Sequence, residues 1–283
     1  MEKFQDLHDI RTSLFVKSET LWLLSILLGI ATQGIVLILP FINNNSIVTT
    51  TGFFLILFPI ISSIMKELSS AYKNKGDKCR RLILYSDGLG NNISPHDLSN
   101  IRCTILGKAK LKEAPFVKPY YASNFPPGYK RLADITAESA FFTMHLARKM
   151  VFFVSFLIVL SVSILLAAVY FIYIAANSTN ILTGTTNLAI VAKTVAVSMS
   201  FIFSCEIFFL WFKYNSLSNV ASLVYKDCDM LRKEEAPNSI QVTQAIEEYH
   251  VSLIQSPPIP KGVYLKYKDQ LNEAYRKSHY QEN

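Results

Sequence analysis

Four long apolar stretches constrain this chain more than any other feature of its sequence. They cover residues 20–41, 47–65, 150–176 and 188–212. A hydrocarbon core about 30 Å thick is crossed by about 20 apolar helical residues. Hydrophobic residues make up 51% of the 283 positions, and four such runs exceed what a chain of this length could bury in a soluble core. The sequence therefore predicts an all-α membrane protein with four transmembrane helices in two hairpins.

The distribution of Lys and Arg predicts the topology. The connections 42–46 and 177–187 contain no charged residue, whereas every Lys and Arg except Lys193 lies in the leader, the central segment or the tail. Positively charged loops resist translocation across the membrane. We therefore expect both termini and the central segment to be cytoplasmic. Lys193 lies near the outer end of the fourth stretch, where its long stem can reach the headgroups.

These boundaries divide the chain into five parts. We expect a cytoplasmic leader helix along the inner interface, a first hairpin, a cytoplasmic ligand-binding region, a second hairpin and a cytoplasmic helical tail. Helical periodicity begins near Lys130, leads into the third stretch, and places on one face Leu132, Ile135, Ser139, Phe142 and Leu146. A heptad-like seam continues the fourth stretch inward. Two further helices are expected at about 242–253 and 262–278, and the apolar face of the first is Val242, Ile246, Tyr249 and Leu253. The five parts are residues 1–19, 20–65, 66–149, 150–212 and 213–283; the seam is Leu217, Ala221, Val224, Cys228 and Leu231.

Neither a cofactor nor a metal is expected. Cys79, Cys103, Cys205 and Cys228 are scattered without a C-x-x-C pair, and the five His residues are equally dispersed. No paired acids and no nucleophile with a neighbouring base emerge from the predicted cytoplasmic parts. The sequence therefore favours a function other than enzymatic catalysis.

Glu206 lies within the fourth apolar stretch, where an ionisable side chain costs about 2.5–3.5 kcal/mol and needs a partner or water. It shares an approximate four-residue stripe with Thr194 and Ser198. In an oligomer, one Glu from each subunit would form a ring of carboxylates that favours cations. The alternative is a protonated or hydrogen-bonded Glu that holds helices together. Thr194, Ser198 and Glu206 are the candidate pore residues.

The first stretch carries a stripe of small and polar residues, Ser25, Gly29, Thr32 and Gln33. Small residues allow helices in a membrane to approach closely, and an amide can hydrogen-bond across to a neighbour. We expect this stripe to pack against another helix rather than to conduct.

The segment 102–131 combines basic and aromatic residues, with Glu113 as its one acid. Basic groups hold phosphates while aromatic rings stack on splayed bases, a combination suited to single-stranded nucleic acid. Contact with anionic lipid and simple folding of a small domain are the alternatives. The candidate ligand-binding residues are Lys108, Lys110, Lys112, Lys118, Tyr120, Tyr121, Lys130 and Arg131.

Within and after this segment, the chain carries Tyr-Tyr-Ala-Ser at 120–123, Pro-Pro-Gly at 126–128, Arg-Leu at 131–132 and Glu-Ser-Ala-Phe-Phe-Thr at 138–143. This block resembles the four-span membrane effectors of the bacterial Hailong antiphage defence system. The four-span effectors that accompany bacterial cyclic-nucleotide synthases share the layout, but their Trp-rich and Cys-Gln-Arg motifs are missing here.

The resemblance implies an ion channel of the bacterial inner membrane, assembled as a homotetramer. It also implies that a single-stranded oligodeoxyadenylate, made by a partner nucleotidyltransferase, keeps the pore closed and that its loss depolarises the cell. Under this hypothesis Glu206 serves the pore, and the basic, aromatic segment binds the strand. The alternatives are a pore opened by a cyclic oligonucleotide and a non-conducting adaptor that binds lipid or protein.

Overall fold

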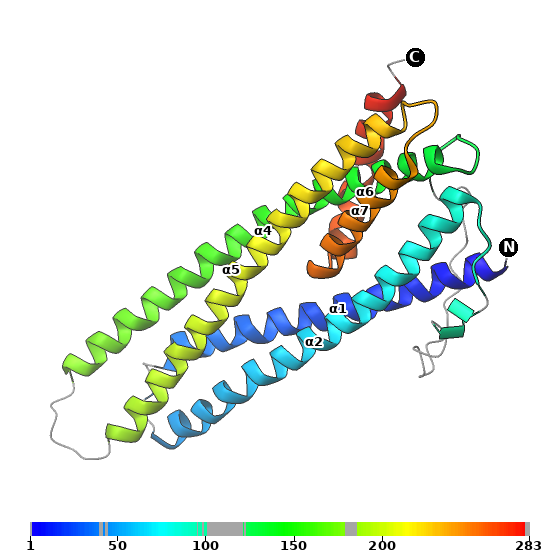
Figure 1. Cartoon of the computed structure of the whole chain (residues 1–283). Helices are drawn as coiled ribbons and strands as arrows, with labels where there is room; N and C mark the ends of the chain where they lie inside the picture. The colour runs from blue at the N-terminus through cyan, green and yellow to red at the C-terminus, as the bar shows by residue number, and fades with distance from the viewer. Residues whose placement is uncertain are drawn as a thin grey trace. The chain divides into compact units, whose positions relative to one another are not determined.

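The computed structural model describes residues 2–39, 42, 45–94, 96–97, 99–100, 121, 123–178 and 186–280, and no β-strand occurs among them. Six helices account for most of this part of the chain (Figure 1). They are α1 (Glu2–Ile38), α2 (Asn45–Leu89), α4 (Tyr129–Ser178), α5 (Thr186–Leu231), α6 (Ser239–Gln255) and α7 (Lys261–Tyr280). The all-helical prediction is confirmed.

Three helical segments in the described part of the chain are long and apolar enough to cross a membrane. They are Leu7–Ile38 in α1, Ser46–Leu89 in α2 and Tyr129–Tyr170 in α4. The fourth apolar stretch, 188–212, lies within α5, a continuous helix of 46 residues. The chain is therefore a helical protein with three helices suited to a membrane.

Contacts between Cα atoms divide the chain into two compact units. Unit 1 comprises Met1–Glu19, Ser70–Met150 and Lys213–Asn283, and unit 2 comprises Thr20–Ser69 and Val151–Phe212. These boundaries fall within four residues of those drawn from hydropathy. Helices α1, α2, α4 and α5 each contribute one portion to each unit.

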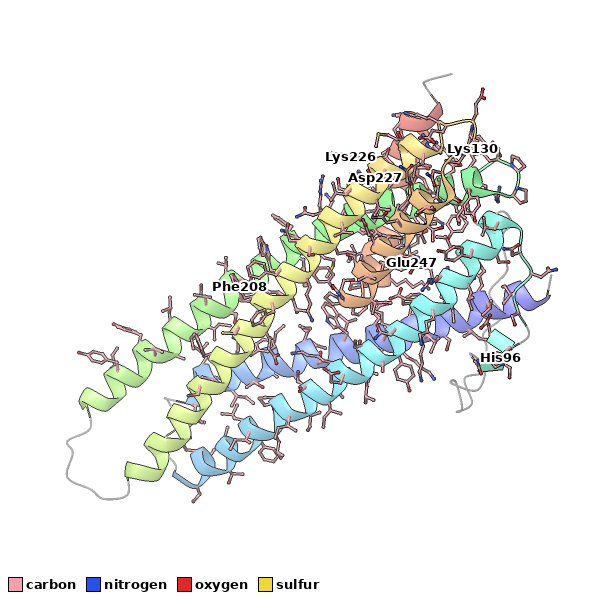
Figure 2. All side chains as sticks on the ribbon, in the orientation of Figure 1. His96, Lys130, Phe208, Lys226, Asp227 and Glu247 are labelled. Atoms are coloured by element: carbon pink, nitrogen blue, oxygen red, sulfur yellow. The ribbon has the colours of Figure 1, made fainter. Side chains whose placement is uncertain are left out.

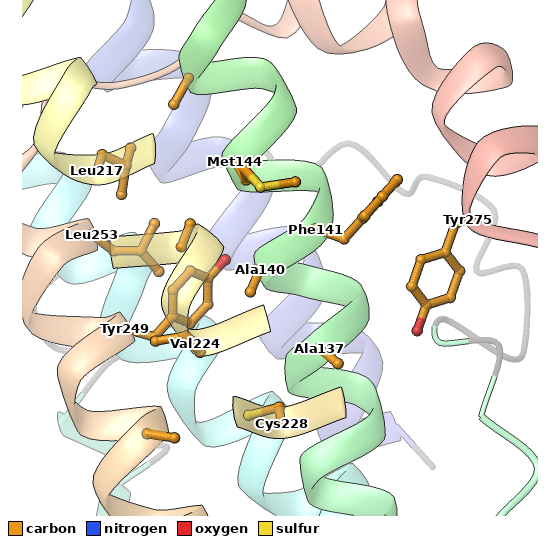
Figure 3. Close-up of a cluster of buried hydrophobic side chains, with 13 residues drawn as sticks. Ala137, Ala140, Phe141, Met144, Leu217, Val224, Cys228, Tyr249, Leu253 and Tyr275 are labelled. Carbon is orange, nitrogen blue, oxygen red and sulfur yellow. The ribbon is translucent and has the colours of Figure 1, made fainter. Parts of the chain in front are cut away.

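The core of unit 1 forms around the first half of α4. Small residues of α4, such as Ala137 and Ala140, meet α5 and α6, while Phe141 meets Tyr275 of α7 (Figure 3). Four residues of the predicted α5 seam are buried in this cluster: Leu217, Ala221, Val224 and Cys228. The seam therefore packs within the chain, which explains why the hydrophobic spacing continues beyond the apolar stretch.

The first half of α4 is buried on more sides than its sequence pattern indicates. The expected face included Leu132, Ile135 and Leu146, and these are buried, but Ala133 and Ala137 are buried as well. Contacts with α2, α5 and α6 account for this, since the two clusters that contain α4 draw on all three helices. Alanine contributes little to a pattern of large apolar residues, yet Ala133 and Ala137 are buried where α4 approaches its neighbouring helices.

The leader is helical as predicted, but it is the first part of α1 rather than a separate helix. Its residues Leu7, Ile10 and Leu14 pack against Cys79 and Ile83 of α2. This apolar face is therefore covered by protein within unit 1, and it is not open to an interface as the sequence had suggested.

Unit 1 buries its apolar side chains in a core, whereas unit 2 exposes many of its large apolar side chains. Phe152 is 79% exposed, and Val159 and Leu166 are also largely exposed. Its interior contains the predicted polar stripe of α1: Gln33 donates to Ser161 Oγ, and Ser62 Oγ donates to the Ser25 carbonyl at 3.0 Å. The packing role predicted for this stripe is confirmed.

Candidate functional site

Glu206 forms an ion pair within unit 2. Its Oε2 atom accepts from Nζ of Lys66, which lies on α2 directly after the second apolar stretch. The same Nζ lies 5.7 Å from the ring centroid of Phe203, three residues before Glu206 on α5. The Lys66 ammonium therefore contacts both a carboxylate and the negative face of an aromatic ring. These contacts link α2 to α5.

The Glu206–Lys66 pair is not enclosed by its own chain. The side chain of Glu206 is 42% exposed and that of Lys66 is 23% exposed. Two opposite charges in contact cost less in a membrane than one alone, but the exposed carboxylate edge still requires water or another polar group. Glu206 therefore holds helices together, as one of the two sequence alternatives predicts, and the pore alternative stays a prediction.

Lys66 was not among the candidate residues, although the sequence contains a signal for it. It is the first charged residue after the second apolar stretch, and Glu206 lies about one and a half turns before the end of the fourth. A flexible four-carbon stem can reach back to that depth. A lone acid in one apolar stretch therefore predicts a basic partner at a similar depth in or just after a neighbouring stretch, and Lys66 is such a residue.

The other candidate pore residues are described in part. Ser198 is exposed on α5, eight residues or about 12 Å along the helix from Glu206. Thr194 lies in the same helix, and its side chain falls outside the described part of the structure. The pore assignment of all three residues stays a prediction.

Most of the predicted ligand-binding set lies outside the described residues: Lys108, Lys110, Lys112, Lys118 and Tyr120. Tyr121 is described and is 4% exposed, in a cluster with Leu84 of α2 and Leu132 of α4. A ring in this position anchors the segment to the core of unit 1 and presents no free face for stacking.

Arg131 holds together the segment that precedes α4. Its guanidinium donates to the carbonyls of Ser123 and Phe125 at 2.8 and 3.0 Å. It also donates to the Asp87 carbonyl and, at 3.1 Å, to the Asp87 carboxylate. These contacts join the segment to the end of α2, so the arginine has a structural role that the sequence did not indicate.

Lys130, labelled in Figure 2, is the member of the set whose described surroundings suit a ligand. Its Nζ lies 5.0 Å from the ring centroid of Phe125, and both side chains are partly exposed. A cation beside an aromatic ring is the arrangement that contacts phosphate and base together. The binding prediction therefore rests here on Lys130 and Phe125.

Unit 1 also contains a buried polar network that the sequence analysis missed. Arg80 of α2 donates to Ser139 Oγ of α4 at 2.5 Å and to the hydroxyl of Tyr249 of α6 at 2.7 Å. About two turns earlier on α2, Lys73 pairs with Asp77 at 2.9 Å and donates to the Leu253 carbonyl. The network joins three helices. Lys73 and Asp77 are four residues apart, but the contacts that α2 makes with α4 and α6 join residues far apart in sequence, so no local motif marks them.

His250 lies beside this network and is 2% exposed. Its Nε2 atom has no hydrogen-bond partner. Burial, together with the charges of Arg80 and Arg81, lowers the pKa of His250 to about 3. The imidazole is therefore neutral at physiological pH.

Within the described residues, no three His, Cys, Asp or Glu side chains gather as a metal site would require. No protein-family model, curated protein or solved structure matches this chain.

Proposed function

We propose that this chain is a membrane effector that conducts ions as an oligomer under the control of a nucleic-acid ligand. In this proposal the fourth apolar stretch of α5 is a fourth span, and both termini and unit 1 are cytoplasmic. The loop charges favour this topology, and the three membrane-suited helices supply its framework. The location is the bacterial inner membrane, as the family resemblance implies.

The observation that carries the proposal is the exposed edge of the Glu206–Lys66 pair. A carboxylate that is 42% exposed in a membrane-suited region is unstable against lipid, so it needs water or a neighbouring subunit beside it. A water-filled path between subunits meets this need. It also gives Glu206 the position from which a ring of carboxylates selects cations.

The pair further suggests how the path opens and closes. While Lys66 neutralises Glu206, the ring presents little net charge to a cation. Separating the two side chains would leave the carboxylates free. A ligand controls this equilibrium only by binding one state more tightly than the other. Helices α2 and α5 run from unit 2 into unit 1, the unit that contains the proposed ligand-binding segment.

Single-channel recording of the purified protein in planar bilayers tests the pore. We expect Glu206→Gln to lower cation preference and conductance, because the ring loses its charge. Lys66→Gln should instead raise the open probability, because the carboxylate loses its partner. Currents from both variants that match the wild-type current would refute the pore assignment.

Glu67→Gln is the matched control for this experiment. Glu67 is exposed on α2 beside Lys66, about 100° around the helix, so the same charge change is made at the same depth on another face. Its conductance and preference should remain those of the wild type. Absence of current from the wild-type protein, together with a normal membrane potential in expressing cells, would favour the non-conducting adaptor.

The ligand hypothesis is tested separately by binding of short single-stranded oligodeoxyadenylate at several salt concentrations. Phosphate contacts require affinity to fall as salt rises. Tyr120→Ala or Phe125→Ala should cost about 1–3 kcal/mol of binding free energy if bases stack on these rings. Lys130→Gln should reduce the salt dependence, whereas Lys226→Gln, an exposed change on α5, should not. Binding that is absent or insensitive to salt would exclude this ligand.

A further inference from the structure

The start of α7 carries a concentration of basic and apolar side chains that the proposed channel does not use. Lys261, Lys266 and Lys268 are exposed, and Tyr264 and Leu265 are 38% and 57% exposed. No acid occurs between residues 256 and 268. In contrast, the rest of the helix, from residue 269 onward, includes Asp269 and Glu273, and its Tyr275 lies in the core of unit 1.

Two contacts fix how α7 lies along α4. Tyr275 meets Phe141 with ring centroids 5.3 Å apart (Figure 3), and Tyr267 lies 4.9 Å from Nζ of Lys149. Both pairs are separated by eight residues on each helix, in opposite directions. The two helices are therefore antiparallel, and each step toward the start of α7 is a step along α4 toward its apolar stretch.

A third contact places the start of α7 beside the exit of the chain from unit 1. The buried hydroxyl of Tyr214 donates to the Pro258 carbonyl at 2.7 Å, just before α7 begins. Tyr214 is the second residue of unit 1 after the fourth apolar stretch. Lys149 is likewise the penultimate residue of unit 1 before α4 enters the third stretch. The first turns of α7 thus lie at the edge of unit 1 from which two apolar helices leave.

This edge is basic on all three helices. Arg148 and Lys149 of α4, and Lys213 of α5, are exposed, as are the three lysines of α7. The flanking segments 139–149 and 213–226 contain no acid. Exposed Tyr and Leu side chains next to lysines are typical of a helix that lies in a membrane interface, with the rings among the headgroups and the cations on phosphates.

We propose that the first two turns of α7, residues 261–268, dock on the anionic phospholipids of the leaflet that faces unit 1. The charge and the apolar residues match such a surface, and the neighbouring apolar helices bring it within reach. The docked helix fixes α4 and the tail at the membrane boundary. The inference rests on membrane insertion of the chain but not on ion conduction.

The test places a fluorescent NBD label on the full-length protein in vesicles that contain brominated lipid. The label is attached at Leu265→Cys in a Cys103→Ser/Cys205→Ser background. We expect quenching at position 265 when the vesicles contain phosphatidylglycerol, and weaker quenching when they contain phosphatidylcholine alone. Substituting Lys261, Lys266 and Lys268 by Gln should lower the docking equilibrium constant about fivefold for each lysine removed.

Two further label positions make the result decisive. Ala274→Cys lies nine residues or about 14 Å farther along α7, so it should be quenched little in either lipid. Phe152→Cys, at a 79% exposed position in the third apolar stretch, should be quenched in both. Quenching at 152 alone would overturn the docking proposal while membrane insertion stands. Equal quenching at 265 with and without anionic lipid, or a blue-shifted label at 265 without quenching, would also overturn it.

Discussion

Unit 1 buries charged side chains between its helices, whereas unit 2 turns large apolar side chains outward. In unit 1, the side chains of Lys73 and Asp77 are 5% and 2% exposed, and Arg80 joins α2 to α4 and α6. In unit 2, Phe152 and Val159 are exposed, and the described ion pair, Lys66–Glu206, stays partly open. The contrast indicates two different solvents, since water drives apolar groups inward and lipid does not.

Breaking the buried pair of unit 1 should have the largest effect. Lys73→Met leaves the Asp77 carboxyl buried without its Lys partner, and it removes the donor to the Leu253 carbonyl. We expect a loss of about 3–5 kcal/mol in the free energy of unfolding, measured by denaturant titration in detergent. The double variant Lys73→Met/Asp77→Leu should recover much of this loss, because no isolated charge remains.

The exposed pair between Lys233 and Asp229 is the control for that measurement. Lys233 is 54% exposed, so Lys233→Met should cost less than about 1 kcal/mol. If Lys73→Met costs no more than Lys233→Met, then the buried charges of unit 1 are not what holds α2 and α6 together.

In unit 2, close packing should matter more than charge. An added Cβ atom at Gly29 would lie 1.8 Å from the ring of Phe203, which is itself 5% exposed. Gly29→Ala should therefore cost about 1–3 kcal/mol through overpacking. Gly34, one and a half turns later on α1, has no atom within 4 Å of such a Cβ. Gly34→Ala should leave stability unchanged or raise it by up to about 1 kcal/mol.

The Gly29→Ala variant also tests whether the packing of α1 affects the Glu206–Lys66 pair. Displacing the Phe203 ring removes the aromatic face beside Lys66 Nζ, so the ion pair with Glu206 should loosen. A Gly29→Ala protein with lower stability but wild-type conductance would separate the packing of α1 from the Glu206–Lys66 pair.

The sequence predicted those features of the structure that depend on residues close together in the chain. Apolar length and helical spacing are local, so the helices and the buried positions Val242, Ile246, Tyr249 and Leu253 of α6 could be predicted. The stripe around Gln33 was also predictable, because a polar residue in an apolar helix needs a neighbour.

The missed features depend on partners far away in the sequence. Arg131 is basic like its neighbours, yet it bonds to the Ser123, Phe125 and Asp87 carbonyls, and no spacing rule distinguishes such a contact from a phosphate contact. The network of Arg80 with Ser139 and Tyr249 requires three helices to meet. Tertiary packing decides such cases, and the sequence pattern does not contain it.

The prediction with the smallest expected effect concerns the pH dependence of stability, which should differ between the two units. The pKa of His250 is about 3 in the folded chain and 6.5 when exposed, so below pH 6.5 the unfolded chain binds a proton that the folded chain does not. Stability contributed by the neutral imidazole is therefore complete above pH 6.5 and declines as the pH falls toward 3. Between pH 6.5 and 5.5 the loss should be about 1 kcal/mol.

Hydrogen exchange of α6 amides, corrected for the intrinsic pH dependence of exchange, measures this loss where His250 lies. His250→Phe should reduce the slope, because that ring no longer titrates, but His8 of the same unit, whose pKa burial lowers to about 4, still contributes. His96→Phe, at an exposed position, should retain the full slope. Amides of α1 between residues 20 and 38, in unit 2, should show little change over the same range. A pH slope in α6 that His250→Phe leaves unchanged would assign the effect to other groups, and an equal slope in α1 would show that the two units unfold as one.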